Sequence, residues 1–411
     1  MGNRFFKETI RDIDLRDQTV LVRTDYNVPM TSDGKISDDL RIRASLPTLK
    51  YLLEQNCKII IISHLGRPKG RQKKYSLAPV AAHLADTLGQ SVRFVDDCVG
   101  DKVRQMVRYS RRGSITMLEN LRFYAEEEAD DLTFARSIVK ATGAEYFVQD
   151  GFGVVHRNHA STHAITLCIP GVAGFLLEKE YLTITRVIKR PHHPLVAIFG
   201  GAKVSDKIGL IHRLMKKADT VLIGGAMANT FLDYKGYDIG SSRAEIDQKV
   251  TLDEIYQEAR EKVGSKSVDD FLRLPSDVAV AREPRANSVR REVGLEQVAT
   301  DEKILDIGTQ TIADFAEVIA GAKTVIWNGP LGYAEAKPFA IGSARTAMAI
   351  AQNSKATSIV GGGDTADFVL KWDGNDGASF THVSTGGGAS MELMAGKKLP
   401  GVESLLDSYG L

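Results

Sequence analysis

The sequence predicts an α/β protein with two Rossmann-like domains, each a parallel sheet flanked by helices. Short apolar runs alternate with helical patterns, as in parallel sheets whose strands are buried on both faces. The chain has 411 residues, more than one hydrophobic core usually serves. Pro191 and Pro194 stiffen a segment near the middle, and the residues that follow each strand differ in kind before and after it.

Composition excludes several classes of protein. Lys and Arg number 53 against 52 acidic residues, so no overall field favours binding to nucleic acid or a membrane. Cys57, Cys98 and Cys168 show no CxxC spacing, which fits buried thiols in a reducing compartment. The N-terminus lacks the apolar run of a signal peptide, and no apolar segment is long enough to span a bilayer. We therefore expect a cytoplasmic protein.

Four predicted strands in the first half, residues 19–22, 58–62, 114–118 and 146–148, lead into basic and polar side chains. Ligands of open α/β sheets bind at the carboxyl edge, so these side chains are candidates for one site. They are Arg23, Asp25, Asn27, His64, Arg67, Arg122, His156 and Arg157, with Arg41 opening a predicted helix over 42–53. Because guanidinium groups match carboxylate and phosphate oxygens in pairs, the set predicts a site for a small anion carrying both. The alternative is that each arginine is a separate surface or salt-bridging residue.

Two further charged runs are expected to be solvated surface and are assigned no function. Residues 69–74 are basic, but they lack interleaved aromatic residues and are expected to form a solvated loop. Glu126, Glu127 and Glu128 are expected to form a solvated helix face.

The second half begins after a predicted helix over 178–189 and the proline segment 191–194. Its predicted strands, residues 195–199, 220–223, 324–327, 358–360 and 382–384, are each followed by glycine. Glycine lets a ligand approach the backbone closely, so this rim predicts a nucleotide site. We assign domains to 1–177 and 195–398, with 178–194 between them.

The stretch 358–366 carries the strongest single signal. A strand runs into Gly361, Gly362 and Gly363 and then into Asp364 and Thr365. A helix beginning near Thr365 would direct its amides at a phosphate, and Asp364 would supply an oxygen ligand for Mg²⁺. The alternative is an ordinary turn in which Asp364 caps the helix.

Lys203 and Lys207 lie four residues apart at the start of another predicted helix. This spacing would place both ammonium groups on one face, near a helix end where cations are unfavourable. We therefore expect an anion between them.

The sequence lacks the motifs of three familiar classes of protein. There is no Walker A sequence, no His-Arg-Asp or Asp-Phe-Gly, and no complete Gly-x-Gly-x-x-Gly. The sequence thus argues against a P-loop protein, a protein kinase and a dinucleotide dehydrogenase.

Seven blocks together resemble phosphoglycerate kinase: VRTDYNVP (22–29), SHLGRP (63–68), LENLR (118–122), GGAKVSDK (200–207), WNGPLG (327–332), GGGDT (361–365) and STGGG (384–388). The resemblance implies two domains joined by a hinge helix, with the tail 399–411 returning to the first. It implies reversible phosphoryl transfer between 1,3-bisphosphoglycerate and Mg-ADP, giving 3-phosphoglycerate and ATP in glycolysis or gluconeogenesis. The alternative is a non-catalytic nucleotide-binding regulator on the same fold.

The same resemblance implies roles for individual residues. Phosphoglycerate would bind to Arg23, Asp25, Asn27, Arg41, His64, Arg67, Arg122, His156 and Arg157. The transferring group would meet Arg41, Lys203, Gly363 and Gly386. Nucleotide and Mg²⁺ would bind to Gly201, Ala202, Lys203, Lys207, Gly225, Asn328, Pro330, Gly332, Glu335, Gly361, Gly362, Gly363, Asp364 and Thr365, with Asp364 as the metal ligand.

Departures from the family pattern include Tyr26, Gln149, Gly151, Val154, Val155, Ala226, Thr309 and Gln310, and none removes a charged group from the implied site. The resemblance implies that the nucleophile is an ionised carboxylate, so a catalytic dyad is not expected. We expect a monomer that binds small molecules and neither nucleic acid nor membranes.

Overall fold

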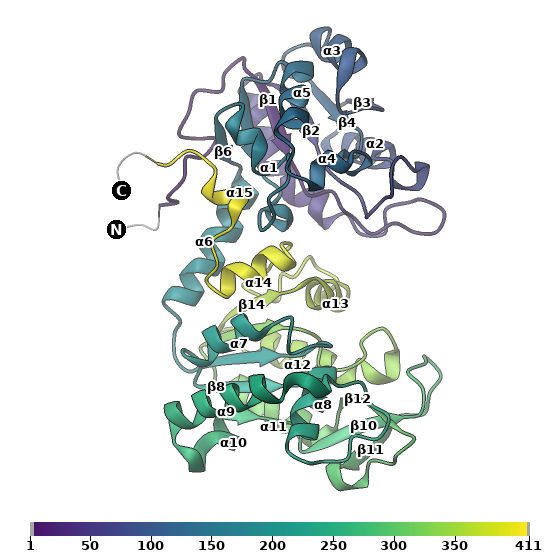
Figure 1. Ribbon diagram of the computed structural model, residues 1–411, viewed down its shortest axis with the longest axis vertical. Helices are drawn as coiled ribbons and strands as arrows, with labels where there is room; N and C mark the ends of the chain where they lie inside the picture. The colour runs from purple at the N-terminus through teal and green to yellow at the C-terminus, as the bar shows by residue number, and fades with distance from the viewer. Residues whose placement is uncertain (1–3, 409–411) are drawn as a thin grey trace. The chain divides into compact units, whose positions relative to one another are not determined.

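A computed structural model of the chain describes residues 4–408 (Figure 1). They form two compact units. The first comprises the described residues up to Leu182 and those from Lys398 onwards, and the second is Thr183–Lys397. The division falls inside helix α6 (Phe175–Lys189), within the segment 178–194 that the sequence placed between domains.

A parallel six-stranded sheet with the order β3-β4-β2-β1-β5-β6 forms the centre of the first unit. Its strands are β1 (Thr19–Arg23), β2 (Lys58–Ile62), β3 (Val92–Val95), β4 (Ile115–Leu118), β5 (Tyr146–Gln149) and β6 (Gly171–Ala173). The four predicted strands are present, and they occupy the inner positions. The sequence missed β3 and β6 because both are short edge strands, one of which exposes Arg93 and the other of which begins with glycine.

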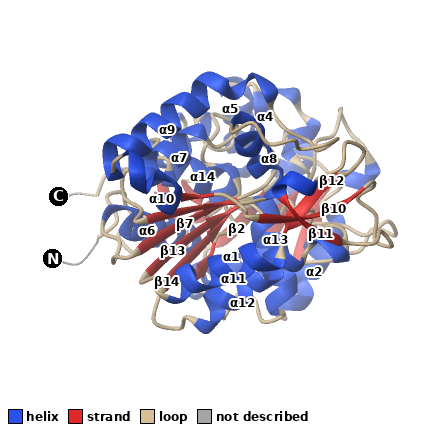
Figure 2. Cartoon of the chain, turned by 90° about the horizontal axis from the view of Figure 1, so that it is seen from below, coloured by secondary structure: helices blue, strands red, loops and turns tan. Residues whose placement is uncertain are grey.

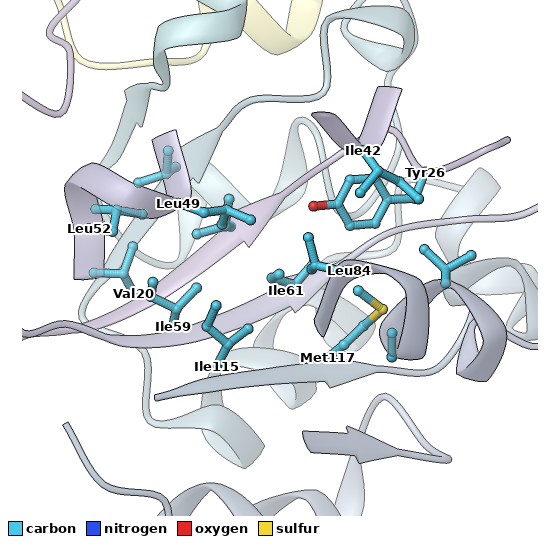
Figure 3. Close-up of a cluster of buried hydrophobic side chains, with 14 of the residues drawn as sticks. Val20, Tyr26, Ile42, Leu49, Leu52, Ile59, Ile61, Leu84, Ile115 and Met117 are labelled. Atoms are coloured by element: carbon cyan, nitrogen blue, oxygen red, sulfur yellow. The ribbon is translucent and has the colours of Figure 1, made fainter. Parts of the chain in front are cut away.

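Helices cover this sheet and enclose its core. They are α1 (Leu40–Glu54), α2 (Ala78–Leu88), α3 (Gly100–Arg108), α4 (Ala125–Glu128) and α5 (Leu132–Thr142), with short 3₁₀ turns η1 (Lys73–Tyr75), η2 (Leu121–Phe123), η3 (Phe152–Val154) and η4 (Ala164–Leu167). In Figure 3, Leu49 and Leu52 of α1 pack over Val20 and Ile59 of the sheet. This buried layer fixes the strand ends that carry the polar residues.

The C-terminal segment packs within the first unit. Lys7 Nζ donates to the carbonyl oxygens of Glu403 at 2.7 Å and Leu405 at 2.9 Å. The amide of Gly401, in α15 (Pro400–Glu403), donates to the Val155 carbonyl at 2.9 Å.

The second unit also contains a parallel six-stranded sheet, with the order β15-β14-β13-β7-β8-β9. Its strands are β7 (Leu195–Phe199), β8 (Thr220–Ile223), β9 (Leu272–Arg273), β13 (Thr324–Asn328), β14 (Thr357–Gly361) and β15 (His382–Val383). A separate antiparallel sheet contains β10 (Asp277–Ala281), β11 (Arg291–Gly294) and β12 (Lys303–Ile307) in the order β11-β10-β12. The sequence analysis predicted neither β9 nor this small sheet. Three of the four residues of β11 are exposed, so that strand has no apolar pattern to detect.

Figure 2 shows helices on both faces of the larger sheet in the second unit. They are α7 (Ile208–Met215), α8 (Gly225–Tyr234), α9 (Lys249–Val263), α10 (Val268–Phe271), α11 (Thr309–Ala320), α12 (Ile341–Gln352), α13 (Gly363–Asp373) and α14 (Gly388–Met394), with 3₁₀ turns η5 (Ile246–Gln248), η6 (Ser265–Ser267), η7 (Leu295–Gln297) and η8 (Lys337–Phe339). Across residues 4–408, no helix is both long and apolar enough to cross a bilayer.

Candidate active site

The ends of β1 and β2 are joined by the Ser63 hydroxyl. It donates to the Thr24 carbonyl at 2.8 Å and accepts from the Tyr26 amide at 2.9 Å. The Asn27 side chain makes a second link, because its Oδ1 accepts from the Gly66 amide at 2.7 Å. These bonds hold Asp25 and His64 next to each other at the carboxyl edge of the sheet.

Asp25 and His64 face a third group, the Arg41 guanidinium from the first turn of α1. Arg41 donates to Asp25 Oδ2 at 2.6 Å, and its side chain remains 28% exposed. His64 Nδ1 lies 3.9 Å from Asp25 Oδ1. Burial, and then the charges of three neighbouring arginines, hold the pKa of His64 well below its usual value. His64 is therefore a neutral imidazole that can donate or accept a hydrogen bond.

Arg23 lies beneath this edge rather than on it. Its side chain is 1% exposed, and its Nε donates to Ser161 Oγ at 2.7 Å. Its other nitrogens reach the Thr24 carbonyl and, at 3.3 Å, His64 Nδ1. We predicted direct contact between Arg23 and the ligand, but this burial makes Arg23 a support for His64 instead.

Glu127 is the counter-ion of Arg23, at 3.8 Å, and it is completely buried. Its carboxylate accepts from the Ser161 hydroxyl at 2.6 Å and the Ser161 amide at 3.1 Å. Burial raises the pKa of Glu127 despite the Arg23 charge. The prediction of a solvated face is therefore wrong for Glu127. No local pattern distinguishes it from Glu126 and Glu128, which are exposed.

A cluster of arginines completes the basic edge. Arg122 donates to the Gly66 carbonyl at 2.8 Å and pairs with Glu128 at 3.0 Å. Burial lowers the pKa of Arg122, and the positive charges of Arg157 and Arg67 add to that effect. Arg67 is exposed and, among residues 4–408, has no hydrogen-bonding or ionic partner. Three of the five arginines here are paired with carboxylates, so Arg67 and Arg157 leave the excess of positive charge that an anion site requires.

His156 and His159 lie in the segment of chain that follows β5. His156 is half-buried, whereas His159 is 6% exposed. Burial and the charges of Arg23 and Arg122 lower the pKa of His159 to about 3. His159 is therefore neutral and belongs to the buried layer that also contains Arg23 and Glu127.

In the second unit, glycines let the loops after β7, β8 and β13 touch one another. A Cβ at Gly200 would lie 2.2 Å from the Pro330 carbonyl oxygen, and one at Gly225 would lie 2.7 Å from the Gly201 amide. Gly225 also has a φ of 64°. The Gly201 amide donates to the Pro330 carbonyl at 2.8 Å. These glycines are needed for backbone packing as well as for any ligand that approaches them.

Lys207 is fixed among these loops. Its Nζ donates to the carbonyls of Gly200 at 2.7 Å and Asn328 at 3.0 Å. Burial lowers its pKa to about 8, although the charge of Asp364 opposes that shift.

The predicted pairing of Lys203 and Lys207 on one helix face is wrong. Helix α7 begins only at Ile208, and Lys203 is exposed in the preceding loop. Glu245 holds that loop by accepting hydrogen bonds from the amide and hydroxyl of Ser205. The two ammonium groups therefore occupy different local environments.

The side-chain amide of Asn328, at the end of β13, is buried. The residue is 1% exposed, and neither its Oδ1 nor its Nδ2 has a hydrogen-bond partner among the described residues. Buried polar atoms are rarely left unpaired, so the Asn328 side chain can hydrogen-bond to a ligand at this turn. A Cβ at Gly362 would lie 3.1 Å from Nδ2, which places the glycine turn beside it.

Helix α13 starts at Gly363, earlier than the predicted start near Thr365. Gly362 precedes it with a φ of 91° and no side chain caps the helix, so Asp364 is not a cap. Asp364 is exposed in the first turn, where its carboxylate could bind a cation. Thr365 is buried, and its Oγ1 accepts from the Gly329 amide at 2.6 Å.

The remaining predicted residues lie around this turn and on neighbouring loops. Glu335 and Gly363 are exposed, Ala202 and Gly332 are half-buried, and Gly361 is buried. The Gly386 amide donates to Ser384 Oγ at 3.1 Å.

The departures from the family pattern lie in different local environments. A Cβ at Gly151 would lie 3.0 Å from the Thr24 backbone, and the Gly151 amide donates to the side chain of buried Gln149 at 3.2 Å. The amides of Thr309 and Gln310, which open α11, donate to Glu292 at 3.2 Å and Asp277 at 3.0 Å. Ala226 lies half-buried in the first turn of α8.

Comparison with known proteins places this geometry in a family. The sequence profile described as phosphoglycerate kinase matches residues 10–397. The chain belongs to the phosphoglycerate kinase family. The family identification made from the seven sequence blocks is confirmed, and with it the assignment as a phosphotransferase.

Two relatives and one solved structure align with nearly the whole chain. The phosphoglycerate kinase of Pelotomaculum thermopropionicum is 44% identical over 98% of this chain and 99% of its own, and that of Desulforapulum autotrophicum is 47% identical over 97% and 100%. The structure of phosphoglycerate kinase from Coxiella burnetii covers 97% of this chain and 98% of its own, with 36% identity and a TM-score of 0.81. The predicted fold class is confirmed.

Proposed function

We propose that this chain catalyses reversible phosphoryl transfer between 1,3-bisphosphoglycerate and Mg-ADP, giving 3-phosphoglycerate and ATP. The observation that carries the proposal is the buried Asn328 amide, which lacks a partner beside an uncapped helix start. A nucleotide phosphate there would accept hydrogen bonds from Asn328 Nδ2 and from the amides at the helix start. Membership in the phosphoglycerate kinase family supports the same reaction.

Phosphoglycerate binds, in this proposal, to the basic edge of the first unit. Arg67, Arg122 and Arg157 supply guanidinium groups, and Asn27 and neutral His64 supply hydrogen bonds. Asp25 orients Arg41, whose side chain remains partly exposed and, in this proposal, contacts the transferring group. Arg23 acts from below through His64, and His156 borders the site.

The nucleotide binds to the second unit. Lys207, the Asn328 amide and the first-turn amides of α13 face its phosphates, and Thr365 fixes the loop at Gly329. Asp364 holds Mg²⁺, for which one carboxylate together with substrate phosphate oxygens is an ordinary ligand set. Bound Mg²⁺ neutralises charge that builds up on the phosphate oxygens. Glu335, exposed on the loop after β13, binds the ribose.

Catalysis requires alignment and charge stabilisation, because the attacking carboxylate is already ionised. Arg41, Lys203 and the amides of Gly363 and Gly386 are the donors to the transferring group. Lys203 is suited to this role because it is exposed on a loop and is not committed to the packing that holds Lys207.

A coupled assay with 3-phosphoglycerate and Mg-ATP tests the proposal. Lys203→Met should lower kcat by about 10² with a modest change in either KM, since it removes one preorganised donor. Binding of both substrates without turnover would instead favour the regulator. A near-normal kcat in Lys203→Met would contradict the role of this residue.

We further propose a cytoplasmic monomer in which α6 and residues 190–194 act as a hinge. Three free cysteines, two of them buried, suit a reducing compartment. Helix α6 runs across the division between the units, as a hinge element would. Light scattering during size-exclusion chromatography would test the monomer.

A further inference from the structure

The loop over residues 332–340, which carries Glu335, rests on the small antiparallel sheet. The Tyr333 amide donates to the Leu305 carbonyl of β12 at 2.7 Å. Ala336 and Phe339 of the loop form a small buried cluster with Ala281 of β10, and Leu305 packs against that cluster. The sheet thus forms the surface against which the loop takes its shape.

Asp306 of β12 lies beside Gly332, at the start of this loop, and Gly342, in the first turn of the helix that follows it. Its carboxylate is buried and accepts from the Gly342 amide at 2.8 Å. A Cβ added at either Gly332 or Gly342 would lie 2.3 Å from Asp306 Oδ1. Only glycine therefore lets the loop approach the carboxylate so closely.

Arg290, which directly precedes β11, completes the contact. Its guanidinium donates to Asp306 Oδ2 at 2.8 Å, to the Pro338 carbonyl at 3.0 Å and to the Ile307 carbonyl at 2.9 Å. Its side chain is 11% exposed. One planar group thereby connects the small sheet to the far part of the loop, which a lysine ammonium could not do with the same geometry.

A contribution to folding stability does not by itself explain the buried pair of Arg290 and Asp306. Burial raises the pKa of Asp306 to about 7 even though Arg290 lies beside it, so the desolvation of the carboxylate outweighs the attraction. Buried ion pairs of this kind are often no more stabilising than apolar residues of the same volume. What the pair supplies, and apolar residues would not, is a defined position for the loop.

We propose that Arg290 and Asp306 are positioning residues that hold the 332–340 loop so that Glu335 meets the ribose of the nucleotide. This proposal rests on the proposed function, because it assumes a nucleotide at Glu335. It assigns the small antiparallel sheet a role in nucleotide affinity, with no role in binding phosphoglycerate.

Arg291 provides a matched control. It is the next residue, on β11, and it pairs with Glu302, but its side chain is 48% exposed. Arg290→Met should weaken Mg-ADP binding about tenfold by calorimetry, because displacement of a positioned group is costly, and should leave 3-phosphoglycerate binding unchanged. Arg291→Met should change neither, since exposed pairs contribute little. Equal Mg-ADP affinity in Arg290→Met and the unmodified chain would overturn the proposal.

A second variant covers the case in which Arg290→Met does not fold. Arg290→Lys keeps the positive charge but cannot reach all of the acceptors, which also include Glu292 Oε1 at 3.0 Å from Arg290 Nε. It should fold, weaken Mg-ADP binding and accelerate amide hydrogen exchange in residues 332–340. Unchanged binding and unchanged exchange in Arg290→Lys would also overturn the proposal.

The link to Glu335 is tested by a double-mutant cycle. If Arg290 acts through this loop, Arg290→Lys should weaken Mg-ADP binding much less in a Glu335→Ala background than in the unmodified chain. Additive effects would contradict positioning through Glu335. Turnover in the coupled assay is scored separately. A chain that turns over normally but shows additive effects refutes only this inference, whereas absence of turnover in the unmodified chain refutes the proposed function.

Discussion

Glu127→Gln is a direct test of the buried layer beneath the basic edge. The change keeps the shape of the side chain, and glutamine can still accept from Ser161, but Arg23 would remain buried without a counter-ion. At the observed 3.8 Å, an effective dielectric constant of 20 gives roughly 4 kcal/mol for the lost attraction. Breaking a buried pair typically costs about 3–5 kcal/mol. Because burial already raises the pKa of Glu127, we expect the lower end, about 3 kcal/mol.

The assay should follow the two units separately. Both tryptophans, Trp327 and Trp372, lie in the second unit, so tryptophan fluorescence reports unfolding there. Amide hydrogen exchange in β1 and β5 reports the first unit. We expect Glu127→Gln to speed exchange in these strands by about a hundredfold, while exchange in β13 and the fluorescence transition change little.

The control is Glu126→Gln, which makes the same chemical change one residue earlier on an exposed side chain. Exposed substitutions of this kind usually alter stability by less than about 0.5 kcal/mol. If Glu127→Gln and Glu126→Gln were equally stable within that margin, Glu127 would not be acting as a charged partner of Arg23. The account of the buried layer would then have to be abandoned.

Three further predictions concern the ligands. Arg67→Ala should weaken 3-phosphoglycerate binding and spare Mg-ADP binding, and calorimetry showing equal losses would contradict separate sites. A bound phosphate should raise the Lys207 pKa above its value of about 8, so Mg-ADP binding should take up protons near pH 8 and weaken as the pH rises further. Calorimetry in buffers of different ionisation enthalpy would detect this uptake, which Lys207→Met should abolish. Because a phosphoryl group that crosses water is open to hydrolysis, both substrates together should compact the chain more than either alone. An unchanged radius of gyration by small-angle X-ray scattering would contradict this.

The main sheets were predictable because their inner strands carry continuous apolar runs. β1 and β2 each bury all but their first residue, and such runs are long enough to recognise without tertiary information. Edge strands carry no such signal. β9 has two residues and β6 has three, so their pairing depends on the neighbouring strand rather than on their own sequence.

At the site, residue type was predictable but burial was not. Arg23 and Arg67 both follow apolar strands, yet one is buried against Glu127 and the other is exposed. That difference depends on α4 and the segment after β5, which contribute Glu127 and Ser161. The helix start near Lys207 was misplaced for a similar reason, because its ammonium group binds the carbonyls of Gly200, directly after β7, and Asn328, at the end of β13.

Both units place a buried ion pair directly below a loop or strand end that is proposed to contact a ligand. Arg23 and Glu127 lie under His64, and Arg290 and Asp306 lie under the loop that carries Glu335. In each pair burial raises the pKa of the carboxyl group against the pull of its arginine, so the charges are kept at a cost in stability. If positioning is the reason, an apolar replacement of a whole pair should leave the fold intact or stabilise it while weakening one ligand only. Such a result would show that the ion pair is needed for ligand binding and not for folding.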